Sequence, residues 1–308
     1  MNENYVIAIL LCTYNGSKYL REQLDSFIAQ RHANWVLYAS DDGSTDGTLD
    51  ILHEYQRTLG SQLIIFEGPR QGFAKNFISL IQNPNVVADY FAFSDQDDIW
   101  LEDKLMRSLA ALQPVPAEVA ALYCSRTRYI DATGKELGYS PRFGKPPSFR
   151  NALVQSLAGA NTMLINQRTR ALLAATEPDA RIVAHDWLTY LLVSSYQGVI
   201  VYDPRPSLLY RQHSGNLIGS NAGLKRRLTG LIRTMQGRFS EWNEMNLNIL
   251  SRHKSRLGQE NRELLEQFDT ARRSPLIKRM QLLARTGVYR QTTAGNLSLY
   301  AAAILNKL

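Results

Sequence analysis

The chain has 308 residues, of which 44% are hydrophobic and 20% are charged, and its formal net charge is +7. This composition excludes wholesale disorder and is typical of a soluble protein with one large domain, or with one domain and an extension. Cys12 and Cys124 are too few for a disulfide framework and lie in apolar runs, so we expect reduced core thiols. No apolar run is long enough for a signal sequence or a membrane span, which predicts a cytoplasmic location.

The first 113 residues alternate between strand and helix patterns. Strands are expected at 5–12, 35–40, 62–66 and 89–94. The helix after the first strand is predicted behind a Ser17 cap, from apolar residues at helical spacing: Leu20, Leu24, Phe27 and Ile28. Two further helices are expected, one carrying Leu49, Leu52 and Leu59 and one near 73–82. This alternation predicts a mostly parallel central sheet with helices on its faces, an α/β fold.

The pattern loosens after residue 113. We expect a strand at 119–125, an irregular Gly- and Pro-rich stretch at 134–149, a short helix at 150–157, a strand near 162–165, a helix over 185–196, and strands near 198–202 and 206–210. From about residue 222 the pattern is helical. The expected domains are therefore 1–220, with halves 1–113 and 114–220, and a C-terminal extension at 221–308.

The positive charge is concentrated in that extension. Residues 221–308 hold 16 lysines and arginines against 6 acids, whereas residues 1–220 hold 19 against 22. Residues 226–239 predict an amphipathic helix with a cationic face. Such a helix either lies on an anionic membrane surface or packs on the main domain with a solvated polar face, and both interpretations remain open.

Polar clusters follow three strands of the predicted sheet: 13 TYNGS, 41 DDGSTDG and 95 DQDD. Because ligands bind at the carboxyl ends of strands in such sheets, we expect these clusters to line one cleft. Asp95 and Asp97 have the spacing to present two carboxylates to a hard cation such as Mg²⁺ or Mn²⁺, together with substrate phosphates. The alternative is a solvated turn.

The 41 DDGSTDG cluster does not fit a calcium loop, because it lacks acids at positions 1, 3 and 5 with Glu at 12. Asp41 and Asp42 are candidates for bonding the edge of a pyrimidine or a ribose hydroxyl. The alternative is a turn in which Ser44 or Asp46 caps the next helix. Neither glycine-rich phosphate motif is present, so a metal would have to hold the phosphates.

A set of motifs, in this order and spacing, resembles family 2 glycosyltransferases with the GT-A fold, and most closely the bacterial rhamnosyltransferases. The set is 13 TYNGSKYL 20, 41 DDGSTDGT 48, 95 DQDD 98, 159 GANTML 164, 185 HDW 187 and 210 YRQHSGN 216. It covers about residues 5–220, and the ordered set is much more specific than any one piece.

The resemblance implies a role for each matching residue. The metal ligands would be Asp97 and His213, and the catalytic base would be Asp186. Acceptor binding would fall to Gly159, Ala160, Asn161 and Trp187. The nucleotide sugar would contact Thr13, Tyr14, Asn15, Asp41, Asp42, Arg70, Lys75, Asp95, Gln96, Asp98 and Arg211, with the Tyr14 ring stacked on the base.

The implied activity is a metal-dependent, inverting transfer of a sugar to a hydroxyl of a lipid-linked bacterial surface glycan, such as a lipopolysaccharide core or O-antigen. The implied donor is dTDP-L-rhamnose, and another UDP- or dTDP-sugar is the alternative. Residues 1–113 would bind the donor and 114–220 the acceptor glycan or glycolipid, at the cytoplasmic face of an anionic inner membrane. No nucleic-acid partner is expected.

Other functions stay open at this point. A noncatalytic protein could use the basic extension to hold membrane or nucleic acid, although the acidic cleft would then be unexplained. A hydrolase or nucleotidyltransferase would use the same metal cleft. Individually, Asp186 could cap a helix, Trp187 could be core, and His213 could be a structural histidine.

Overall fold

The computed structural model describes residues 4–213 and 238–308, which divide into two compact units. Of the described residues, the first unit comprises 4–142, 158–175 and 198–213, and the second comprises 143–157, 176–197 and 238–308. Residues 143–157 and 176–197 thus group with the C-terminal helices. The predicted domain boundary at 220 and most of the predicted helix at 226–239 lie outside the described residues, so both stay predictions.

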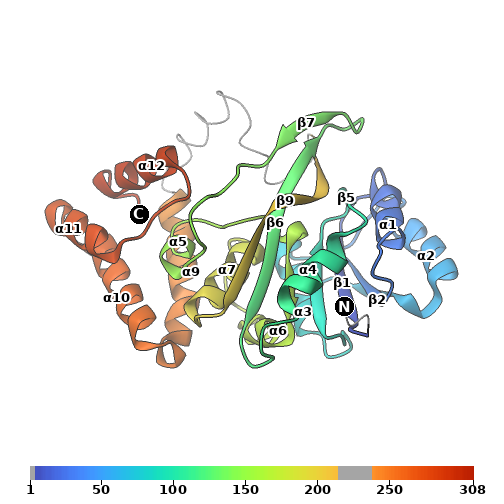
Figure 1. Ribbon diagram of the computed structural model, residues 1–308, viewed down its shortest axis with the longest axis horizontal. Coiled ribbons are helices and arrows are strands. Elements are labelled where there is room, and N and C mark those ends of the chain that lie inside the picture. Colours follow the sequence, from blue (N-terminus) through green and yellow to red (C-terminus); the bar gives the residue numbers. More distant parts are fainter. Residues whose placement is uncertain (1–3, 214–237) are drawn as a thin grey trace. The chain divides into compact units, whose positions relative to one another are not determined.

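One mixed sheet forms the centre of the first unit. Its strands are β1 (Ile7–Thr13), β2 (Trp35–Asp41), β3 (Leu63–Glu67), β4 (Tyr90–Ser94), β5 (Ile99–Trp100), β6 (Ala121–Ile130), β7 (Glu136–Tyr139), β8 (Leu164–Asn166) and β9 (Val199–Arg211). The order is β3-β2-β1-β4-β8-β6-β9-β5, with β7 paired to β6 (Figure 1). Strands β1 to β4 are mutually parallel, whereas β8 runs antiparallel to both β4 and β6.

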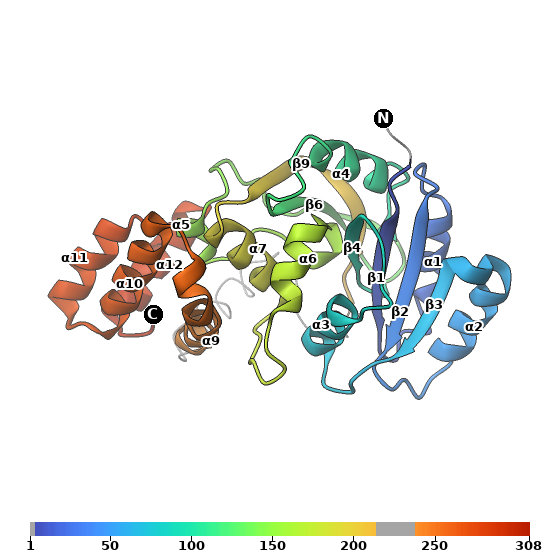
Figure 2. The ribbon, with the colours of Figure 1, turned by 90° about the horizontal axis from the view of Figure 1, so that it is seen from below.

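Helices cover both faces of the parallel strands. They are α1 (Leu20–Ile28), α2 (Thr48–Leu59), α3 (Phe73–Gln82), α4 (Lys104–Leu112) and α6 (Gln167–Ala174). Figure 2 shows α1 and α2 on one side of β1–β3 and α3 on the other. Every residue of β1 is therefore buried, as expected for a strand of a parallel sheet covered on both faces.

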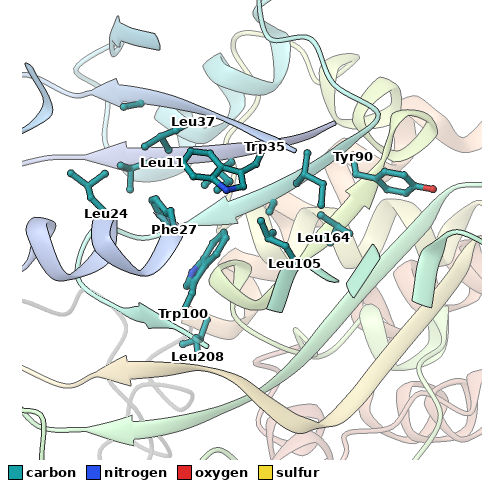
Figure 3. Close-up of a cluster of buried hydrophobic side chains, with 14 of the residues drawn as sticks. Leu11, Leu24, Phe27, Trp35, Leu37, Tyr90, Trp100, Leu105, Leu164 and Leu208 are labelled. Atoms are coloured by element: carbon teal, nitrogen blue, oxygen red, sulfur yellow. The ribbon is translucent and has the colours of Figure 1, made fainter. Parts of the chain in front are cut away.

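The main core lies on the α1 face (Figure 3). Leu11 and Leu37 of neighbouring strands pack there with Leu24 and Phe27 of α1, and the Phe27 ring lies 4.7 Å from the Trp100 ring, centre to centre. On the opposite face, Phe77 of α3 meets Phe93 of β4 at 5.7 Å. Two such layers hold the carboxyl ends of the parallel strands in fixed positions.

Three expectations about local structure were wrong. Helix α1 begins at Leu20 without a side-chain cap, and Ser17 instead donates its backbone N–H to Asp46. The stretch expected to be irregular contains β7, which pairs with β6 across residues 128–130. The two strands expected between 198 and 210 are one strand, β9, whose register against β6 shifts near Arg126.

The second unit is helical. It contains α5 (Phe149–Ala152), α7 (His185–Ser195), α9 (Arg238–His253), α10 (Gln259–Arg273), α11 (Leu276–Thr286) and α12 (Thr293–Ile304). Helix α7 is buried along most of its length; the Trp187 indole N–H donates to the Ala152 carbonyl, and Asn261 of α10 donates to the Ser195 carbonyl. No helix within the described residues is long and apolar enough to cross a membrane.

Candidate active site

The carboxyl ends of β1, β2 and β4 bring the three predicted clusters of the first unit together. Thr13 and Asp41 are register partners at the ends of β1 and β2, and the Thr13 hydroxyl donates to the Asp41 carboxylate at 2.8 Å. The loop after β4 joins them, because the Gln96 side chain bonds both the backbone N–H and the carbonyl of Tyr14, at 2.9 and 3.0 Å. The three clusters therefore meet at one edge of the sheet, and that they line a cleft stays a prediction.

The two acids after β2 organise the backbone around this edge. Asp41 accepts bonds from the backbone N–H groups of Gly43 and Ser44 and from the Ser44 hydroxyl. Asp42 accepts from the backbone N–H groups of Arg70 and Gly72, at 2.6 and 2.8 Å. Both acids thus fix loops, and their contact with a nucleotide stays a prediction.

Tyr14 has the exposure that a base-stacking residue needs. Its side chain is 58% exposed although its backbone is clamped by Gln96. The next residue, Asn15, adopts a left-handed conformation with φ of 48°, accepts a bond from the Thr45 N–H, and donates its own N–H to the Ser44 hydroxyl. An aromatic ring is therefore presented to solvent on a rigid turn.

The predicted metal ligands meet in the structure. His213 follows β9, and its Nε2 atom lies 2.7 Å from Oδ2 of Asp97 in the loop after β4. Both side chains are only partly buried, at 20% and 17% exposed. Asp95 lies two residues before Asp97 in the same loop and is also partly buried. A carboxylate and an imidazole from distant parts of the chain thus share one accessible position.

The buried Arg211 side chain packs behind the Asp97–His213 pair and hydrogen-bonds the backbone of Asp97. It is 1% exposed; its Nε donates to the Asp97 carbonyl at 3.1 Å and its Nη2 forms an ion pair with Glu22 at 2.8 Å. Its guanidinium also lies over the Tyr19 ring, 4.5 Å from the centre, and that ring is 5.1 Å from the His213 ring. Arg211 therefore holds the loop backbone, and its predicted contact with the nucleotide sugar stays a prediction.

Asp98 is fully buried, unlike its neighbours. Its carboxylate accepts a bond from the Asn161 amide at 2.6 Å and another from the Arg211 backbone N–H at 3.2 Å. Burial first, and then the charges of Asp97 and Asp95, raise the pKa of Asp98 well above its usual value. Asp98, predicted to contact the nucleotide sugar, and Asn161, predicted to contact the acceptor substrate, are thus hydrogen-bonded to each other.

A buried lysine lies close to the same loop. Lys104 has no exposed surface, its ammonium lies 4.1 Å from the centre of the Trp100 ring, and it has no hydrogen-bond partner among the described residues. Burial lowers its pKa to about 7, assisted by Arg107 and opposed by Asp98. Positive charge from Arg211, and from Lys104 in its protonated form, thus offsets the acidic loop on its buried side.

The donor set fits a divalent cation only if the substrate completes it. Among residues 4–213 and 238–308, no group of three or more His, Cys, Asp and Glu side chains is arranged to hold a metal alone. Asp97 and His213 provide one oxygen and one nitrogen donor at an accessible position. Mg²⁺ and Mn²⁺ sites commonly use one or two protein ligands with phosphate oxygens and water for the rest.

For the remaining predicted site residues of this unit, the structure gives exposure and backbone conformation but does not link them to the Asp97–His213 pair. Arg70 is exposed with φ of 56° and lies against Gly43, where an added Cβ would be 3.2 Å from its Nε. Lys75 is partly buried in α3. Gly159 is exposed, whereas Ala160 is buried. Their assigned roles stay predictions.

Asp186 and its neighbours belong to the second unit. Asp186 lies in the first turn of α7 and its carboxylate accepts the Trp187 N–H at 2.6 Å. Burial raises its pKa to about 6, while backbone N–H groups and the Ser156 hydroxyl oppose the shift. Trp187 is buried with its N–H bonded to Ala152, and burial lowers the pKa of His185 to about 3. Their predicted roles in acceptor chemistry remain predictions.

Sequence reasoning missed several residues that build the site. Gln23 is fully buried and accepts the Asp98 N–H, and Glu22 pairs with Arg211. Asn76 of α3 exchanges two bonds with Ser40. A signal existed for Gln23, since it is a polar residue on the apolar face of α1, between Leu20 and Leu24.

The sequence is similar to those of known glycosyltransferases. The sequence pattern of glycosyl transferase family 2 matches residues 8–171. The chain is 31% identical over 236 residues to the dTDP-rhamnosyl transferase RfbG of Shigella flexneri. This alignment covers 72% of this chain and 79% of RfbG.

Two solved structures are similar in fold. S. aureus TarS 1–349 in complex with UDP-GlcNAc aligns with a TM-score of 0.57 at 15% identity, over 98% of this chain and 88% of that one. The mannosyltransferase PcManGT from Pyrobaculum calidifontis, in complex with GDP-Man and Mn²⁺, aligns with a TM-score of 0.52 at 16% identity, over 99% and 88%. The predicted fold class is confirmed, and the chain belongs to glycosyltransferase family 2 with the GT-A fold.

Proposed function

We propose that the protein catalyses metal-dependent, inverting transfer of L-rhamnose from dTDP-L-rhamnose to a hydroxyl of a lipid-linked bacterial surface glycan, at the cytoplasmic face of the membrane. The observation that carries the proposal is the 2.7 Å approach of His213 to Asp97, in the loop whose Gln96 bonds the backbone of the exposed Tyr14. The likeness to the dTDP-rhamnosyl transferase RfbG supports this donor over other nucleotide sugars. The alternative is a different UDP- or dTDP-sugar.

The first unit binds the nucleotide in this mechanism. The Tyr14 ring stacks on the base, while Asp41 and Asp42 keep the surrounding loops in place. Asp97 and His213 would hold the cation, which when bound would offset the negative charge that develops on the departing diphosphate. Arg211 contributes by fixing the backbone of the Asp97 loop from its buried side.

Asp186 removes the proton from the acceptor hydroxyl as that oxygen attacks the anomeric carbon. Its pKa of about 6 allows it to be ionised near neutral pH and still to be basic enough to accept a proton. Attack on the face opposite the leaving diphosphate inverts the anomeric configuration. No covalent intermediate with the protein is required.

A panel of nucleotide sugars tests this function. The purified protein is incubated with Mn²⁺ or Mg²⁺ and with dTDP-rhamnose, other dTDP-sugars or UDP-sugars, and both binding and transfer to a lipid-linked glycan acceptor are measured. We expect the dTDP donor to bind best, Asp97→Ala to lose donor binding, and Asp186→Asn to bind donor without turnover. Preferential transfer from a UDP-sugar, or from a dTDP-sugar other than dTDP-rhamnose, would reject dTDP-L-rhamnose as the donor.

A further inference from the structure

Helix α12 presents large apolar side chains to solvent. Leu297, Tyr300 and Ile304 are exposed and follow the i, i+3, i+7 spacing of one helix face. The opposite face is also apolar, with Leu299 and Ala303 completely buried. A helix that is apolar on both sides normally has partners on both sides, and within the described residues only one side of α12 is covered.

Helix α11 extends this exposed surface. Its first two residues, Leu276 and Ile277, are 47% and 75% exposed. The buried Arg279 on the next turn donates to the Ala303 carbonyl at 2.7 Å, which brings the start of α11 to the last turn of α12. Figures 1 and 2 both show α11 and α12 as neighbours. We define the C-terminal apolar face as Leu276, Ile277, Leu297, Tyr300, Ile304 and Leu305.

The charged side chains of α11, α12 and the residues beside them in the sequence are all positive. Residues 274–308 contain five lysines and arginines and no aspartate or glutamate. Lys278 and Arg285 of α11 are exposed, and Lys307 is partly exposed just beyond α12. Exposed apolar residues rimmed by basic residues are typical of surfaces that lie on anionic lipid headgroups. A second copy of the chain fits less well, because the two faces would bring like charges together.

We infer that the C-terminal apolar face docks the protein on an anionic lipid surface. The inference rests on the membrane attachment in the proposed function and assigns it to α11 and α12. The apolar side chains enter the boundary between headgroups and acyl chains, while Lys278, Arg285 and Lys307 meet the headgroup phosphates. Attachment at this face would keep the enzyme beside a lipid-linked acceptor.

Vesicle flotation with the full-length protein tests the assignment without any nucleotide or sugar. We expect binding to vesicles containing phosphatidylglycerol, weak binding to pure phosphatidylcholine, and loss of binding at high salt. The double variant Leu297→Glu with Ile304→Glu should lower the vesicle partition coefficient at least tenfold. The matched control, Val87→Glu, changes a residue of the first unit that is 66% exposed and should bind like the wild type.

Two further measurements keep the test decisive. The circular dichroism and the melting temperature of the double variant should equal those of the wild type, because the changed side chains are exposed. Lys278→Glu with Arg285→Glu should reduce binding to anionic vesicles by a similar factor. Undiminished flotation of either double variant would overturn the inference, as would a wild-type dimer that the Leu297→Glu, Ile304→Glu pair converts to a monomer. Donor binding, measured separately, reports on the proposed function alone.

Discussion

The ionisation of Asp186 predicts the pH dependence of turnover. A general base works only as the carboxylate, and burial raises the pKa of Asp186 to about 6, against the stabilising N–H bond from Trp187. Near pH 5 only about one molecule in eleven would carry the ionised form, so kcat should be about tenfold below its plateau above pH 7. With the ordinary pKa of an aspartate, kcat would be nearly flat over this range.

The raised pKa of Asp186 also makes the stability of the fold depend on pH. Stability should fall as the pH rises, whereas kcat should increase. Since the folded pKa is raised, the protonated form is favoured by folding, and this contribution is present below pH 4 and is lost as the pH rises through about 6. Its upper limit is about 3 kcal/mol from the size of the shift, and partial solvent contact reduces it. Asp186→Asn should therefore be as stable as the wild type at pH 4 and slightly more stable at pH 7.

The assay is steady-state transfer from pH 5 to 8 at saturating donor and Mn²⁺, so that weaker donor binding at low pH does not enter kcat. Asp186→Asn should lose roughly 10²–10⁴-fold in kcat and keep its donor affinity. Asp179→Asn, a change of an exposed acid in the same unit, should keep the wild-type pH profile. A flat wild-type profile, or near-normal turnover in Asp186→Asn, would refute the assignment of the base.

Three substitutions in the first unit test single contacts. Tyr14→Ala should weaken dTDP binding by about 1–3 kcal/mol in calorimetry, as expected for lost stacking, and an unchanged affinity would exclude stacking. Gly68→Ala places a Cβ 2.9 Å from a backbone carbonyl oxygen of β2 and should lower the melting temperature by several degrees, whereas Gly144→Ala, with open space around it, should not. Arg211→Met removes the bond to the Asp97 carbonyl and should destabilise the fold by about 1.5–3 kcal/mol and weaken Mn²⁺-dependent dTDP binding; normal stability would argue against its buttressing role.

The parallel part of the fold follows from local sequence patterns. The apolar runs that form β1, β2 and β4 are each followed by polar clusters, and the carboxyl ends of parallel strands place those clusters together whatever the loops do. The rest of the sheet was harder to predict. Pro204 and Pro206 interrupt the pattern of β9, so a single strand reads as two. The glycines around β7 suggest a loop, but pairing with β6 makes it a strand.

The accessible residues of the site were easier to predict than the residues beneath them. Asp97 and His213 belong to recognisable motifs, and the structure brings them within hydrogen-bond distance. The partner of Arg211 could not be read from the sequence, because Glu22 lies 189 residues away and nothing local marks the pair. Asp98 is fully buried, whereas Asp95 and Asp97 of the same acidic run are partly exposed. The sequence alone does not show which of the three acids is buried.

The central claim is that Asp97 and His213 bind a cation together with a nucleoside diphosphate. Isothermal titration of the protein with dTDP, in the presence of Mn²⁺ and then with the metal chelated, tests it most directly. The account predicts binding that weakens at least a hundredfold without metal and is equally weak in Asp97→Ala, while Asp50→Ala, a change of an exposed acid on α2, behaves as wild type. Equal dTDP affinity with and without metal, or an unchanged affinity in Asp97→Ala, would contradict it.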